Sequence, residues 1–261
     1  MLETRRKQIL GTLILVAVPA ITLVVAPYTL LDPMAVPKMT ALAFLSIVAL
    51  CLIAPTLKNL SHSNYKTLAI LTALFVFQIF LVVLFSGANI TAQILGTYQR
   101  QTGALTYISL ALLMLSASFI SDGDFVKRFI HITLIVGVIL IAYGNLQYFG
   151  LEPFPYVNAY TVNAPIGTFG NPNFQSAFMG IVGAAAIVSL FDGELRPQVR
   201  ILIGGISTAS IIGIYSTDSW QGFFNLFAGV AAGLVLLLFR WKRFNSAFLV
   251  LGGSIASGII V

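Results

Sequence analysis

Charged residues are scarce in this chain. Asp, Glu, Lys and Arg make up 8% of its 261 residues, and hydrophobic residues make up 58%. Soluble domains carry roughly 25% charged residues. A single water-soluble core of this size cannot bury so many apolar side chains, because a polar surface must still be built around it. The composition therefore excludes a soluble globular protein.

Cysteine and histidine are also almost absent. The single cysteine, Cys51, lies inside an apolar run, so no disulfide can form within the chain. The two histidines, His62 and His131, are far apart and show no metal-ligand spacing. We therefore expect no metal site and no cofactor.

The abundant feature is a series of long apolar runs, which predicts an all-α integral membrane protein of one domain, 1–261, with about nine transmembrane helices. A helix needs about 20 residues to cross the bilayer core, and open strands would leave backbone groups unpaired in lipid. The first run is too long for a signal peptide and is expected to be retained. The runs are 9–29, 40–55, 67–85, 104–120, 129–149, 174–191, 201–216, 223–239 and 244–261.

The distribution of Lys and Arg predicts the orientation. Of the 14 Lys and Arg residues, 12 lie on the amino-terminal side of the predicted bundle, and only Lys38 and Arg100 lie on the other. Loops rich in Lys and Arg stay inside the cell, so the amino terminus is expected to be cytoplasmic. The formal net charge of +6 is then a topology signal, and nucleic acid is not an expected partner.

The predicted outer face carries most of the unusual polar sequence, in segments 86–103, 150–173 and 216–222. Helices entered from this side begin there, and a helix amino terminus is a favourable anion site. Asn171 followed by Pro172 predicts a helix start, and Asp218 or Ser219 could cap the helix over 223–239. Two interpretations stay open: a phosphate or diphosphate site, and ordinary helix capping.

Two further patterns lie within the spans. Asn145 and Gln147, near the outer end of run 129–149, are expected to face the bundle interior, either as structural hydrogen-bonding groups or as substrate contacts. Small residues also recur at every fourth position and predict close helix contacts. They are Gly205, Ala209 and Gly213, and then Gly229 and Gly233.

Three outer-face elements, taken in order, resemble a known family. The first is Asp32-Pro33 with Pro37-Lys38, after the first run. The second is a G-x-x-x-R-x-x-G element, and the third is a G-x-x-x-N-x-N element that opens a later span. The second comprises Gly96, Arg100 and Gly103, and the third Gly167, Asn171 and Asn173. This pattern, over about residues 30–230, resembles the O-antigen ligase family of bacterial membrane glycosyltransferases.

The resemblance implies a GT-C-like membrane fold and transfer of a glycan from an undecaprenyl diphosphate carrier. The acceptor would be a glycan, a lipid or a protein, on the outer side of the bacterial cytoplasmic membrane. By this analogy Arg100 would bind the diphosphate and stabilise charge on the leaving group. The remaining candidates for binding diphosphate or glycan are Lys38, Asn171, Asn173, Asp218 and Gln221. No residue is assigned as the catalytic base.

The chain departs from the family pattern in two places. Where the family has Ser-Arg-Gly, this chain reads Ser219-Trp220-Gln221-Gly222, without the arginine. The family also has a long outer loop with a catalytic histidine after these spans, and neither His62 nor His131 can replace it, since both are predicted inside. We therefore expect the amino-terminal part of a longer protein. An anion transporter of the bicarbonate type and a noncatalytic membrane scaffold are the alternatives.

Overall fold

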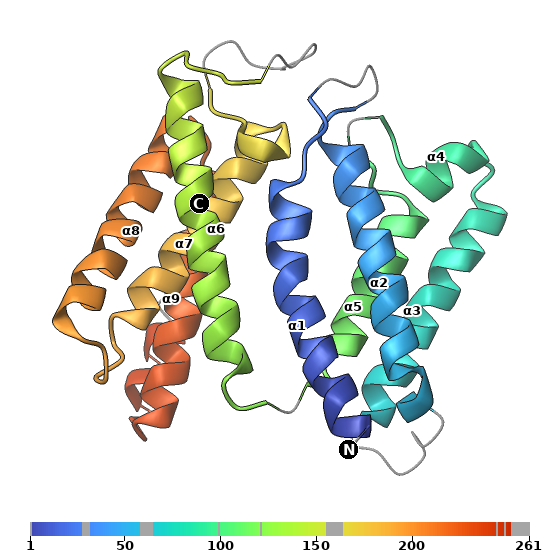
Figure 1. The fold of residues 1–261 in the computed structure, drawn as a ribbon, viewed down its shortest axis with the longest axis horizontal. Helices are drawn as coiled ribbons and strands as arrows, with labels where there is room; N and C mark the ends of the chain where they lie inside the picture. Colours follow the sequence, from blue (N-terminus) through green and yellow to red (C-terminus); the bar gives the residue numbers. More distant parts are fainter. Residues whose placement is uncertain are drawn as a thin grey trace. The chain divides into compact units, whose positions relative to one another are not determined.

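The structure is a computed structural model, and it describes residues 2–27, 32–57, 65–98, 100–120, 122–154, 164–243, 245–247 and 249–251. Within these residues the fold is all-helical (Figure 1). The helices are α1 (Leu2–Leu23), α2 (Ala35–Leu57), α3 (Lys66–Phe85), α4 (Ile90–Leu95), α5 (Ala104–Ala117), α6 (Phe125–Tyr148), α7 (Pro172–Ser189), α8 (Pro197–Ser216) and α9 (Gln221–Arg240), with a short 3₁₀ helix, η2 (Gly167–Phe169), before α7.

Six of these helices are long and apolar enough to cross a membrane: α1, α2, α3, α6, α8 and α9. By length and composition, the described helices are consistent with the predicted α-helical, multi-pass membrane protein. Helices also form at two other predicted spans, but α5 has only 14 residues, and α7 is not among the six. Most of the predicted ninth span lies outside the described residues, so the count of nine stays a prediction.

The side chains that face outward are apolar, as expected of helices in lipid. Thr72 is the buried residue of α3, whereas Leu74, Phe77 and Phe80 are each more than half exposed. Large exposed apolar patches are rare on soluble monomers. Several buried hydroxyls are satisfied inside their own helices: Ser116 donates to the Leu112 carbonyl and Ser210 to the Ile206 carbonyl, both four residues earlier.

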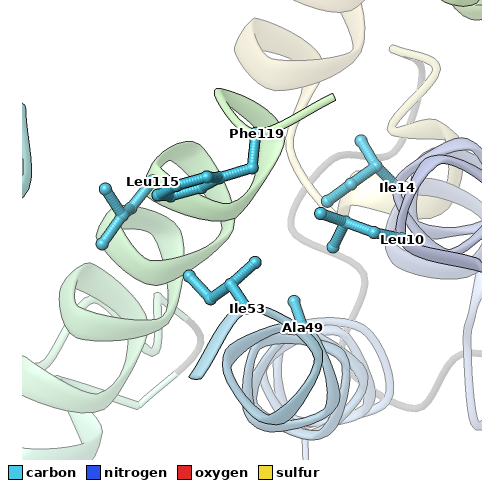
Figure 2. Packing of buried hydrophobic residues seen from close by; sticks show 6 residues of the cluster. All are labelled: Leu10, Ile14, Ala49, Ile53, Leu115 and Phe119. Atoms are coloured by element: carbon cyan, nitrogen blue, oxygen red, sulfur yellow. The ribbon is translucent and has the colours of Figure 1, made fainter. Parts of the chain in front are cut away.

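The chain divides into two compact units, residues 1–132 and 133–261. The first contains α1 to α5 and the first turns of α6. Its buried core joins α1, α2 and the end of α5, and Figure 2 shows the cluster of apolar side chains that meet there. The cluster comprises Leu10, Ile14, Ala49, Ile53, Leu115 and Phe119.

The second unit is built around α7, which packs against both α8 and α9. Glycines allow α7 and α9 to approach closely. A Cβ added at Gly222, Gly229 or Gly233 of α9 would come within 3.0 Å of Ser176, Ala184 or Val188 of α7, respectively. The predicted small face at Gly229 and Gly233 is therefore confirmed as a helix contact.

The other predicted small face is only partly used. Gly213 contacts Met179 of α7, but a Cβ added at Gly205 would meet nothing within 4 Å among the described residues. The described residues thus show no helix contact at Gly205, and the predicted contact there stays a prediction. Small residues at every fourth position create a flat helix face, but only the tertiary arrangement determines whether another helix covers it.

Candidate functional site

Arg100 lies on a tight loop, residues 96–103, that joins α4 to α5. Gly96 has a φ of 92°, which a residue with a side chain rarely adopts. A Cβ added at Gly96 would overlap the backbone of Thr102 and Gly103, and one added at Gly103 would overlap the backbone of Ile94 and Gly96. The two glycines of the G-x-x-x-R-x-x-G element therefore allow the two ends of the loop to touch.

Backbone hydrogen bonds complete this loop and place Arg100 at its turn. The amides of Arg100 and Gln101 both donate to the Thr97 carbonyl, at 3.1 and 3.0 Å, and the Thr106 hydroxyl donates to the Gln101 carbonyl. Arg100 is exposed. Within the described residues its guanidinium has no ion-pair partner, so its five donors remain available for a carboxylate, phosphate or diphosphate.

The loop is preceded by a helix that the polar sequence of segment 86–103 did not predict. The Asn89 side chain accepts from the Thr91 amide at 2.9 Å and from the Ala92 amide at 3.4 Å, and so caps α4. The signal was present in Asn89, a favoured capping residue. It was missed because six residues are too few to show helical periodicity.

Lys38, in the first turn of α2, is occupied by protein carbonyls. Its Nζ atom donates to the carbonyls of Ile21, Thr22 and Val24, at 3.2, 2.7 and 3.0 Å. These carbonyls belong to the carboxyl end of α1, where a helix leaves acceptors unpaired and carries a partial negative charge. The contacts give Lys38 a structural role at the end of α1, and its predicted contact with a diphosphate stays a prediction.

Asp32 stabilises the connection between α1 and α2 where α2 begins. Its Oδ1 atom accepts from the amides of Met34 and Ala35, at 3.0 and 2.8 Å, where α2 begins. The carboxylate is buried, and Oδ2 has no hydrogen-bond partner within the described part of the chain. Asp32 and Lys38, both members of the first family-like element, therefore hold the α1–α2 connection together.

In the second unit, the segment before α7 is held by Gln147, at the end of α6. Gln147 accepts from the amides of Ile166 and Gly167 through Oε1, at 3.0 and 2.7 Å. Its Nε2 atom donates to Glu152 at 2.6 Å, and the Tyr143 hydroxyl donates to the same carboxylate at 2.7 Å. Gln147 is thus a structural hydrogen-bonding residue, one of the two roles that the sequence left open.

Gln175 fixes the same segment from inside α7, and sequence reasoning did not single it out. Its side chain is buried, and Nε2 donates to the Leu140 carbonyl of α6 at 3.2 Å. A Cβ at Gly167 would overlap the Gln175 amide, and the φ of Gly167 is 55°. Glycine is therefore required at the first position of the G-x-x-x-N-x-N element. A glutamine inside an apolar run was the available signal.

Asn171 and Asn173 lie at the start of α7. The Asn171 side chain accepts from the Asn173 amide at 2.8 Å, and Pro172 occupies the first helical position. The predicted helix start is therefore confirmed. Asn173 is exposed, and its side chain remains a candidate for contact with a substrate.

Asp218 lies in the turn between α8 and α9, Gln221 is the first residue of α9, and both are exposed. The capping prediction for Asp218 is wrong, because Trp220 occupies the N-cap position of α9. Asp218 instead has a φ of 52°, a conformation that aspartate tolerates better than most residues. The Ser219 hydroxyl accepts from the Gln221 amide at a long 3.4 Å. A carboxylate repels phosphate, so Asp218 is a poor ligand for a diphosphate.

A serine of α7 connects these two helix starts. The Ser176 hydroxyl donates to the Ser219 carbonyl at 3.1 Å and accepts from the Gly222 amide at 3.0 Å. Ser176 is fully buried. The second unit therefore brings the α7 and α9 starts together, and with them four of the six candidate residues. Arg100 and Lys38 belong to the first unit.

Asn145 has a different environment from the predicted one. The sequence placed it in the bundle interior beside Gln147, but its side chain is exposed and lines a cleft of about 610 Å³ in the second unit. The reason is helical geometry, because residues two apart point in different directions around a helix. Gln147 therefore faces the segment before α7, whereas Asn145 does not.

Ionisable residues in the described segments do not form a metal centre. No group of three or more His, Cys, Asp or Glu side chains gathers among them. His131 is exposed on α6, and His62 lies outside the described residues, as do residues 155–163 of the predicted outer segment.

A scan against protein-family models, a search of curated proteins and a search of solved structures found no match to this chain.

Proposed function

We propose that this chain is a membrane glycosyltransferase of the O-antigen ligase type. It would transfer a glycan from an undecaprenyl diphosphate carrier to a glycan, lipid or protein acceptor at the outer face of a bacterial cytoplasmic membrane. In this proposal the amino terminus is cytoplasmic, and the Arg100 loop and the α7 and α9 starts lie at the outer face. The catalytic base remains unassigned.

The observation that carries the proposal is the Arg100 loop. Its two glycines permit a closed turn that no other residue pair would allow, and the turn holds an exposed arginine without an ion-pair partner among the described residues. An arginine on the side of the membrane where Lys and Arg are rare has no topological reason to be there. A guanidinium is well suited to bind two phosphate oxygens at once.

The segment before α7 adds a second, independent support. Gly167 and Asn171 of the G-x-x-x-N-x-N element have distinct structural roles, one as the contact site of Gln175 and one as the α7 cap. These contacts leave the Asn173 side chain exposed. Two of the three motif positions therefore have a defined geometric role, which supports the proposed resemblance better than a match of residue types alone does.

Binding of undecaprenyl diphosphate to the full chain in nanodiscs tests the proposal. We expect Arg100→Ala to raise the Kd about tenfold, since a hydrogen bond to a charged group contributes about 1.5–3 kcal/mol. Arg100→Lys should recover part of this loss, because it keeps the charge but not the planar guanidinium. Arg196→Ala is the matched control, since Arg196 is also exposed but begins α8 at the predicted cytoplasmic side.

An unchanged Kd in Arg100→Ala would remove Arg100 from the proposal and, with it, the main support for the function. Failure to bind undecaprenyl diphosphate, together with Arg100-dependent uptake of labelled bicarbonate into vesicles, would instead indicate an anion transporter.

A further inference from the structure

The second unit contains a cleft with an unusual lining. Its volume is about 610 Å³, within the range of small-molecule sites. Five aromatic side chains line it, from three different elements: the end of α6, the end of α8 and the start of α9. They are Tyr148, Phe149, Tyr215, Trp220 and Phe223.

Most of these rings are open to a ligand. Tyr215 is 79% exposed, Trp220 77% and Phe149 72%. Tyr148 and Phe149 meet edge to face, with ring centroids 5.5 Å apart, and Trp220 and Phe223 form a second pair at 6.0 Å. Aromatic rings also gather at membrane interfaces for general reasons, but here they line a concave volume with a charged group.

That charged group is Asp218, and it determines the sign of the ligand. It is the one ionisable acid or base in the lining, apart from tyrosine hydroxyls. Within the described residues its carboxylate has no ion-pair partner. Lysine and arginine are absent from the lining, so the cleft disfavours phosphate and favours a cation. The faces of aromatic rings are negative as well and attract cations.

The apolar part of the lining determines the kind of cation. Ile212 and Ile214 lie beside the rings, and these surfaces would not compensate a small metal ion for the loss of its water. A quaternary ammonium spreads its charge over methyl and methylene groups that can contact rings and aliphatic side chains, and a primary ammonium donates its N–H groups to a carboxylate. Aromatic side chains with a carboxylate are a common way to bind such groups.

We propose that this cleft binds an organic ammonium group of the choline or ethanolamine type, with Asp218 as its counter-ion and Trp220 and Tyr215 as the ring surfaces. The same chemistry is available from a soluble amine and from the headgroup of a zwitterionic lipid. This proposal does not rest on the diphosphate site proposed at Arg100.

The two tryptophans of the chain allow a direct test. Trp220 is the N-cap of α9 and Trp241 its C-cap, so a 20-residue helix separates them by about 30 Å. In Trp241→Phe the remaining fluorescence comes from the cleft, and in Trp220→Phe it comes from the far end of α9. Both variants of the full chain, in detergent, would be titrated with choline chloride against sodium chloride at equal ionic strength.

We expect a saturable change of fluorescence in Trp241→Phe and none in Trp220→Phe. Adding Asp218→Asn should raise the apparent Kd for choline about tenfold, and Tyr215→Ala should also weaken binding. Tyr107→Ala, at an exposed tyrosine of α5, is the matched control and should leave the Kd unchanged. Circular dichroism of each variant would confirm that the helices are intact.

Nanodiscs separate the two sources of the ammonium group. If a lipid headgroup occupies the cleft, the Trp220 emission should differ between phosphatidylethanolamine and phosphatidylglycerol discs, and choline should compete. If a soluble amine is the ligand, the emission should be the same in both discs. The proposal is overturned if choline causes no saturable change of fluorescence, or if Asp218→Asn binds choline as well as the parent does. It is also overturned if maltotriose, an uncharged glycan, binds and choline does not.

Discussion

The two segments that carry the family-like motifs are held in opposite ways. The loop over 96–103 is built mainly from backbone contacts, with Gly96 and Gly103 in contact and carbonyls as the acceptors, and the Thr106 hydroxyl adds one side-chain bond. The segment before α7 is held by side chains, since Gln147 accepts from two of its amides and Gly167 lies against the Gln175 side chain. A side chain can be replaced with a graded loss of stability, whereas a glycine that touches other atoms tolerates almost no replacement. The first segment has two such glycines, Gly96 and Gly103, and the second has one, Gly167. The first region should therefore be the more sensitive to mutation.

The largest effect is expected for Gly96→Ala. The added Cβ would be strained at a φ of 92° and would also overlap backbone atoms that cannot move aside, for a cost of about 3 kcal/mol. Hydrogen exchange over residues 96–103 should become much faster. Gly87→Ala is the control, because Gly87 also has a positive φ, 67°, but an added Cβ would meet nothing within 4 Å. Equal effects of the two substitutions would show that the glycine contact is unimportant.

The corresponding change in the second region is Gln147→Ala, for which we expect a loss of about 2 kcal/mol. It leaves the amides of Ile166 and Gly167 without their acceptor, and each half-buried unpaired group costs about 1–3 kcal/mol, less where water can replace the partner. Exchange of these two amides is the measurement. Asn145→Ala, two residues earlier and exposed, should stay within about 0.5 kcal/mol. A similar loss in both variants would contradict the structural role of Gln147.

A smaller effect is expected for Lys38→Met, which keeps most of the side-chain volume but removes the donor to three carbonyls of α1. The thermal stability of the protein in detergent should fall by the equivalent of about 1–2 kcal/mol. Lys127→Met, at an exposed lysine of α6, is the matched control. If Lys38→Met weakened binding of undecaprenyl diphosphate with no loss of stability, Lys38 would be a ligand-binding residue and its structural role would be contradicted.

The smallest effects concern the two asparagine caps, one in each region. Asn171→Ala should cost about 1 kcal/mol, the usual contribution of an N-cap, and should be detected as a lower Tm because α7 is the central helix of its unit. Asn89→Ala removes a similar cap from the six-residue α4, so its effect should be confined to faster exchange over residues 90–95. Equal changes in Tm would mean that α4 is coupled to the first unit more strongly than its packing indicates.

The sequence predicted the long helices of this protein well, but it predicted only some of the contacts between them. Apolar runs predicted α2, α3 and α5 to α9 near their observed positions, and Asn171-Pro172 marked the start of α7 correctly. Helix α1, Leu2–Leu23, begins and ends six to seven residues before the predicted run 9–29. The short helix α4 was missed, and neither of the two capping candidates, Asp218 or Ser219, is the N-cap of α9, which is Trp220. Local signals act over one or two turns, so they identify long helices more surely than they identify turns.

Candidate residues could be named from the sequence, but their partners could not. Lys38 looked like a ligand for an anion, and the structure shows it bound to the end of α1. Gln175 and Ser176 were not singled out, although both connect α7 to neighbouring helices. These contacts join residues about 16 to 46 positions apart, and such pairings depend on how helices pack rather than on any local pattern.

The sequence by itself determined that this chain is a multi-pass helical membrane protein, since the scarcity of charge and the length of the apolar runs allow no other way to satisfy the backbone. Only the tertiary structure decided which polar groups are already paired within the protein and which are open to a ligand. Arg100 and Asp218 stay exposed while Lys38 and Gln147 are bonded. The physical reason is that pairing depends on the position of the partner, and in this protein the partners lie on other helices or beyond intervening loops.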